Sequence, residues 1–139
     1  PKGEHAMRKI LIVTVLMILT LLITGCGASS DPASLEGEIY WEDGDVLPPG
    51  STVSVQIVNA SLADATETLV QTSFAAEGQP PIVFFVKFEE SAVDDRMTYT
   101  ATVRIEDPDG NLLYITQTAQ PVINQGQVVE PIRILVEPV

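Results

Sequence analysis

Apolar and polar residues alternate with a period of two from Leu35 onward, a pattern that predicts β-strands. The clearest run, residues 98–105, places four apolar side chains on one face: Tyr99, Ala101, Val103 and Ile105. Residues 82–88 (IVFFVKF) are apolar enough to be covered on both faces. Strands are therefore expected over residues 35–41, 52–59, 68–74, 82–88, 98–105, 112–117 and 128–136.

Residues with turn chemistry separate these runs. They lie at residues 43–45 (DGD), 47–50 (LPPG), 78–81 (GQPP) and 107–110 (DPDG). Residues 61–66 and 91–96 could each form a helical turn, and neither is long enough to change the fold class. The pattern predicts an all-β fold, an antiparallel β-sandwich of about seven strands and immunoglobulin-like size, with a small barrel as the alternative.

The N-terminal part has a different pattern. Ile10–Ile23 is almost continuously aliphatic and follows the basic pair Arg8 and Lys9. As a helix it would span roughly 21 Å, short of the ~30 Å hydrocarbon core of a bilayer. We therefore interpret residues 7–25 as a cleaved signal peptide. Residues 1–6 (PKGEHA) show no periodicity and are interpreted as a cloning remnant.

The apolar run ends in Ile23, Thr24, Gly25 and Cys26, which resembles the bacterial lipobox. Small residues let the bond after Gly25 enter a peptidase cleft, and the Cys26 thiol would accept a diacylglyceryl group. Each buried methylene of the acyl chains contributes about 0.8 kcal/mol to anchoring. We therefore expect a lipid anchor at Cys26, a flexible tether over residues 26–34 and a β-sandwich domain over residues 35–139.

Charge limits the binding partners. Of 7 Lys and Arg residues, three precede Cys26, and of 19 acidic residues only Glu4 does, which leaves four basic against 18 acidic residues, a formal charge of −14. Such a domain repels phosphate backbones, so nucleic acid is not an expected partner. The expected location is the cell envelope, at the periplasmic face of the outer membrane if the organism has two membranes, because residue 27 is glycine rather than aspartate.

Candidate chemistry is sparse. His5 is the one histidine and Cys26 the one cysteine, so the domain cannot hold a Ser-His-Asp or Cys-His arrangement, and no enzyme activity or cofactor is expected. Glu106, Asp107 and Asp109 are weak candidates for calcium, and a hairpin turn with solvated acids is the alternative. The other acidic clusters lie at residues 42–45 and among the acids of residues 89–95. A further hypothesis is a hydrolase that uses a pair of these carboxylates as acid and base. Tyr40 and Trp41 could form a partner or glycan surface, and the alternative is that they belong to the core, as most aromatic residues of a sandwich do; Trp41 is the less certain because it adjoins an acidic turn.

Several ordered motifs resemble one family. They are residues 47–51 (LPPGS) before a Val-x-Val strand, 61–65 (SLADA), 79–85 (QPPIVFF), 99–105, 109–114 (DGNLLY) and 121–122. This series, over about residues 35–136, is similar to the YbaY-type lipoproteins, grouped with YscW, the lipoprotein chaperone or pilotin of type III secretion. The resemblance implies a β-sandwich lipoprotein that binds an envelope protein; pilotins deliver a secretin segment to the outer membrane. It carries over no functional residue except Cys26.

The sequence thus predicts a membrane-anchored, protein-binding envelope lipoprotein, possessing no catalytic site and resembling chaperones or pilotins of secretion components. A lipoprotein that binds a small ligand or a glycan is the alternative.

Overall fold

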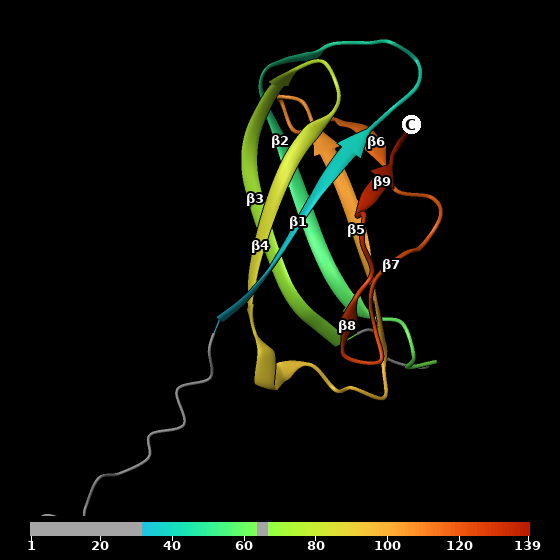
Figure 1. The fold of residues 1–139 in the computed structure, drawn as a ribbon. Helices are drawn as coiled ribbons and strands as arrows, with labels where there is room; N and C mark the ends of the chain where they lie inside the picture. Colours follow the sequence, from blue (N-terminus) through green and yellow to red (C-terminus); the bar gives the residue numbers. More distant parts are fainter. Residues whose placement is uncertain (1–31, 64–66) are drawn as a thin grey trace, which may run out of the picture.

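A computed structural model describes residues 32–63 and 67–139 (Figure 1). Nearly all regular structure in these ranges is β. The strands are β1 (Pro32–Tyr40), β2 (Leu47–Asn59), β3 (Glu67–Gly78), β4 (Ile82–Glu89), β5 (Thr98–Glu106), β6 (Leu112–Ile115), β7 (Gln120–Asn124), β8 (Gln127–Val128), β9 (Arg133–Leu135) and β10 (Glu137–Pro138). A 3-10 turn, Glu90–Ala92, follows β4. No helix among the described residues is long and apolar enough to cross a membrane.

The strands form two sheets. The smaller one has the order β4-β1-β9, and the larger one has the order β10-β6-β5-β2-β3, with the β7–β8 hairpin attached through β5. Neighbouring strands are antiparallel except β1 and β9, which are parallel. The two sheets face each other across one core, so the predicted all-β sandwich is confirmed (Figure 1).

The period-two pattern explains the core. Alternate residues of each central strand point between the sheets, and these are the apolar ones. The larger sheet contributes Val53, Val55, Ile57, Val103 and Ile105, and the smaller one contributes Leu35, Ile39, Phe84 and Val86, all at most 1% exposed.

Several strand boundaries differ from the sequence prediction, including that of β3, which ends at Gly78 rather than at residue 74. β1 begins at Pro32, so residues 32–34 of the expected tether pair with β4, and Ala33 packs against the core. β2 begins at Leu47, because residues 47–50 do not form a separate turn but belong to the strand. The register between β2 and β3 shifts within these residues, between Leu47 and Ser51. The predicted strand 128–136 is divided, because its start lies in β8, which pairs with β7 in the larger sheet, and its end contains β9, which pairs with β1 in the smaller sheet.

The smaller sheet has one covered face. The prediction that residues 82–88 would be covered on both sides is wrong: Val83 is 47% exposed and Phe85 61% exposed. Their side chains point away from the larger sheet, and their cross-strand neighbours on β1 are Glu38 and Glu36. Apolar residues therefore lie beside acids on the outer face of this sheet.

Candidate protein-binding groove

Strand β1 has an open edge along its first half. On one side it pairs with β4 over its whole length except Tyr40, but on the other side β9 pairs with it only from Glu38 to Tyr40. The Glu38 N–H donates to the Ile132 carbonyl at 3.0 Å, and the Tyr40 carbonyl accepts from the Val136 N–H. Backbone groups of alternate residues point to the same side of a strand. The N–H and C=O groups of Ser34 and Glu36 therefore point to the side where, among the described residues, no strand pairs with them.

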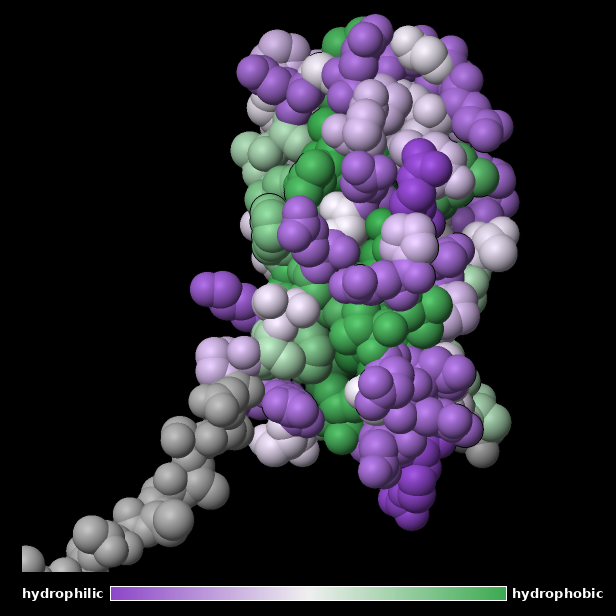
Figure 2. Space-filling model, viewed as in Figure 1, coloured by the Kyte–Doolittle hydropathy of each residue, from purple (hydrophilic) through white to green (hydrophobic). Residues whose placement is uncertain are grey.

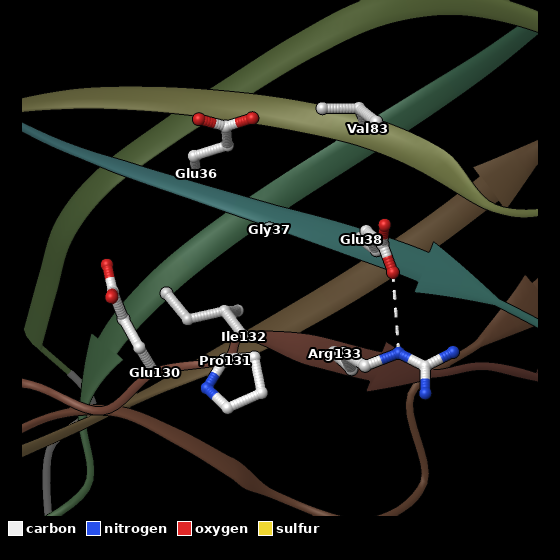
Figure 3. A pocket seen from close by; sticks show the side chains of 8 residues that line it. All are labelled: Glu36, Gly37, Glu38, Val83, Glu130, Pro131, Ile132 and Arg133. Atoms are coloured by element: carbon white, nitrogen blue, oxygen red, sulfur yellow. Dashed lines mark ion pairs between the residues drawn. The ribbon is translucent and has the colours of Figure 1, made fainter.

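The chain before β9 bends away from this edge. The ladder between β1 and β9 ends at Glu38, whose N–H bonds to the Ile132 carbonyl, and does not extend toward the N-terminal half of β1. Between β1 and residues 130–133 lies a hollow of about 560 Å³, lined by Glu36, Gly37, Glu38, Val83, Glu130, Pro131, Ile132 and Arg133. Figure 3 shows the two segments diverging from the Glu38–Arg133 end toward Glu36 and Glu130. We call this the β1 groove.

The floor of the β1 groove is closely packed around Gly37. A Cβ atom at Gly37 would lie 2.7 Å from Ile132 Cγ2 and 2.7 Å from Phe84 Cε1 and Cζ. Phe84 is the cross-strand neighbour of Gly37, so its ring occupies the space that a side chain at residue 37 would need. Glycine lets the ring and Ile132 seal the core directly beneath the groove.

The walls of the β1 groove are acidic. Glu38 forms an ion pair with Arg133 at 3.4 Å, and the Arg133 guanidinium lies 4.8 Å from the centre of the Tyr40 ring. Glu36 and Glu130 are exposed, and neither forms an ion pair with a basic residue of the described ranges. The open half of the groove therefore carries two carboxylates that are not neutralised.

An apolar opening continues from the β1 groove along the same edge. A second hollow, of about 180 Å³, lies between the start of β1 and the β7–β8 hairpin and is lined by Ala33, Phe88, Glu90, Val93, Ile123, Gly126 and Val128. Val128 and Val129 are each more than two-fifths exposed. Figure 2 shows hydrophobic surface in this region, between β1 and the β8 end of the molecule, bordered by hydrophilic residues.

Comparison with known proteins gives the family. Residues 30–132 match the family model of the type III secretion system lipoprotein chaperone, YscW. The chain belongs to the YscW family. The match includes all of β1 through β8 and the residues that line the β1 groove up to Ile132.

Two relatives agree with this assignment to the YscW family. The uncharacterized lipoprotein YbaY of Escherichia coli (strain K12) is 34% identical over 111 residues, covering 74% of this chain and 57% of YbaY. The chain thus spans little more than half the length of that relative. The structure of an alternative pilotin from the type II secretion system of Vibrio cholerae superposes with a TM-score of 0.68 and 26% identity, covering 77% of this chain and 98% of the pilotin. The family description and the names of these two relatives together support a lipoprotein chaperone-like role.

Of the two aromatic residues singled out from the sequence, Trp41 is buried and Tyr40 faces outward. Trp41 is 4% exposed, its Nε1–H donates to the Asp45 carbonyl at 2.8 Å, and its ring is 5.1 Å from the Tyr114 ring. Trp41 is therefore a core residue, contrary to the hypothesis of a surface at this position. The neighbouring alternation explains this result, because residues 35, 37, 39 and 41 share the inward face. Tyr40 points outward and is half-buried beneath Arg133.

The acidic clusters stabilise turns. The Asp107 carboxylate accepts hydrogen bonds from the backbone N–H groups of Asp109 and Asn111 and from Asn111 Nδ2, and these contacts lower its pKa. The side chain that was a weak calcium candidate therefore caps its own turn. Within the described part of the chain no three acidic, histidine or cysteine side chains are grouped as metal ligands would be.

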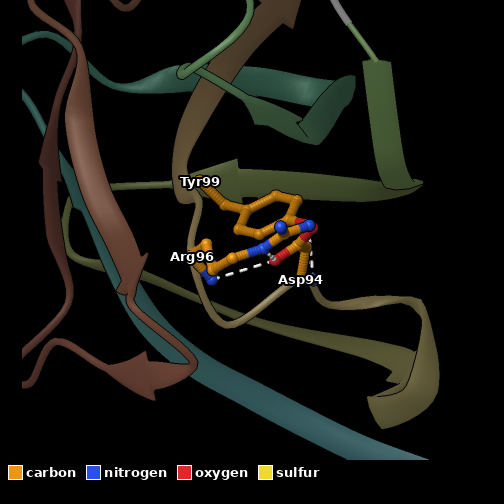
Figure 4. A network of polar contacts seen from close by, with 3 residues as sticks. All are labelled: Asp94, Arg96 and Tyr99. Carbon is orange, nitrogen blue, oxygen red and sulfur yellow. Dashed lines mark hydrogen bonds and ion pairs between the residues drawn. The ribbon is translucent and has the colours of Figure 1, made fainter.

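Two other clusters behave in the same way. Asp94 accepts two hydrogen bonds from the Arg96 guanidinium, at 3.0 and 2.7 Å, and these lower its pKa to about 2 (Figure 4). Asp43 accepts the Tyr114 hydroxyl at 2.9 Å; burial, together with this bond, raises the pKa of Tyr114 to about 12. Neither arrangement leaves a pair of carboxylates facing each other.

The residues of the expected lipobox, Ile23 to Cys26, lie outside the described residues, as do the leader and most of the expected tether. The β1 groove, in contrast, was not found from the sequence. It is formed by two segments, around residues 36 and 130, that only the fold brings together, and neither segment contains a recognisable motif.

Proposed function

We propose that this chain is a membrane-anchored envelope lipoprotein that binds a segment of a partner protein in the β1 groove, as a chaperone or pilotin of an outer-membrane or secretion component. The observation that carries this proposal is the open half of β1 beside a hollow of about 560 Å³. Exposed sheet edges are avoided in soluble proteins unless they are protected or used for binding. Membership of the YscW family supports the same role.

The anchor is part of the proposal. A lipid on Cys26 would hold the domain by a short tether, because β1 begins only six residues after it. The domain itself is too acidic to adhere to anionic head groups by charge. The lipid would therefore determine where the protein is located, and the β1 groove would determine which partner it binds. In an organism with two membranes, the site of action would be the periplasmic face of the outer membrane.

Binding of a glycan or small ligand at Trp41 has lost its support, because that side chain is buried. We also propose no catalytic activity, since the YscW family is one of chaperones and the acidic clusters stabilise turns.

The test is capture of a partner from membranes. Full-length chain carrying an affinity tag is expressed in its native host, cross-linked in intact cells and purified from detergent-solubilised membranes. We expect one enriched envelope protein with the parent and its loss with the double variant Glu36→Lys, Glu130→Lys. The matched control is Glu67→Lys, an exposed acid at the start of β3 in the other sheet. Equal recovery of the partner with the groove variant would contradict the proposal.

A further inference from the structure

We infer that the partner segment binds as an added β-strand beside residues 32–37 of β1, with lysine or arginine on its outer face and apolar residues on its inner face. This inference rests on the proposed function and specifies the conformation and chemistry of the segment that the β1 groove accepts.

The unpaired backbone groups of β1 favour an extended partner segment. The N–H and C=O groups of Ser34 and Glu36 point into the open side of the sheet, in line with the position that β9 occupies further along. A partner's backbone can pair with them only where it is extended, because the backbone groups of a helix are already bonded to one another. A helix would leave this edge unpaired, whereas a strand would continue the order β4-β1-β9 toward the N-terminal end of β1.

The two faces of the added strand would contact different kinds of side chain. Side chains of successive residues in a strand alternate between faces. On the outer face they would lie between Glu36 and Glu130, two exposed carboxylates to which the described residues supply no cation. On the inner face they would lie toward the hollow lined by Ala33, Phe88 and Val128. A segment that alternates basic and apolar residues fits both surfaces.

Charge excludes a second copy of this chain as the bound segment. Two copies pairing edge to edge would bring the acids of β1 together, and the segment from Cys26 onward has a formal charge of −14. Like charges directly opposite each other destabilise a strand pair. Glu36 therefore prevents self-association at the same edge where it would attract a basic strand.

The experiment uses full-length lipidated chain in neutral detergent micelles and two synthetic peptides. One alternates lysine and valine over ten residues, and the other has the same composition arranged as an amphipathic helix. Binding is measured by fluorescence anisotropy, and amide hydrogen exchange is measured by NMR. We expect the alternating peptide to bind at least tenfold more tightly, and the amides of Ser34 and Glu36 to exchange at least tenfold more slowly when it is bound. The double variant Glu36→Lys, Glu130→Lys should weaken binding at least tenfold, and Glu67→Lys should not.

Preference for the helical peptide, or unchanged exchange at Ser34 and Glu36 with the alternating peptide bound, would overturn the strand inference. The same holds if the alternating peptide does not bind. If in those cases cross-linking in cells still captured a partner that the groove variant loses, the proposed function would stand and only the mode of binding would be wrong. Failure of both experiments would remove the function as well.

Discussion

Replacing Gly37 with alanine tests the packing beneath the β1 groove. The new Cβ would lie 2.7 Å from Ile132 Cγ2 and from two atoms of the Phe84 ring, closer than non-bonded carbons approach. Phe84 is 1% exposed and Ile132 5% exposed, so neither side chain has free space to move into. Overpacking of this kind costs about 1–3 kcal/mol. Alanine also restricts the unfolded chain, which offsets about 0.4–1 kcal/mol. We therefore expect a net loss of about 1–2 kcal/mol.

The assay is equilibrium unfolding followed by tryptophan fluorescence. Trp41 is the one tryptophan and is buried, so its emission reports on the core. Each kcal/mol lost lowers Tm by roughly 4–8 °C in a domain of about 100 residues, so the expected decrease in Tm is roughly 4–16 °C. Ser34→Ala, an exposed change in the same strand, should alter stability by less than about 0.5 kcal/mol.

A double-mutant cycle identifies the cause. Phe84→Leu removes the ring atoms that Gly37→Ala would strike, so the double variant should lose less stability than the sum of the single ones. If Gly37→Ala were as stable as the parent, or more stable, the close contact between β1, Phe84 and Ile132 would be refuted.

Three further predictions concern the turns and the anchor. Tyr114→Phe removes the hydrogen bond to Asp43 and should cost about 1–2 kcal/mol in urea unfolding. Because folding raises the pKa of Tyr114 from 10.0 to about 12, its contribution to stability should be complete below pH 10 and lost as the pH rises toward 12. The parent and Tyr114→Phe should therefore converge in stability between pH 10 and 12. A constant difference in stability over that range would contradict the assignment. The Asp94 carboxyl should titrate at about pH 2 by NMR, so that any stability it confers is complete above about pH 4 and declines below it, and Arg96→Ala should return its pKa toward 3.8. Cys26→Ser should move the protein from the membrane to the soluble fraction on cell fractionation, and retention in the membrane would exclude the lipid as its anchor.

Much of the fold could be predicted from local pattern. Residues 98–105 alternate so clearly that the predicted strand differs from β5 by one residue. The residue pattern of a half-buried strand in the middle of a sheet indicates which face is buried, because one face must be apolar and the other polar.

Features that depend on long-range contacts were either predicted wrongly from the sequence or not predicted. The apolar run 82–88 does not reveal that nothing in the described chain covers Val83 and Phe85. Strand β7 is short, contains Pro121 and was not predicted. Trp41 follows the inward alternation of β1, yet its place next to an acidic turn suggested exposure. The β1 groove depends on where the chain at Pro131 leaves the ladder, which only the folded arrangement determines.

The most direct test of the central claim is site-specific photo-cross-linking in living cells. A benzophenone side chain is introduced at Glu36, in the β1 groove, or at Glu67, on the other sheet, in the full-length chain. We expect a cross-link from residue 36 to one extended, basic and apolar segment of an envelope protein, and none to that segment from residue 67. Cross-linking of the partner at residue 67 but not at residue 36 would show that binding occurs elsewhere on the domain.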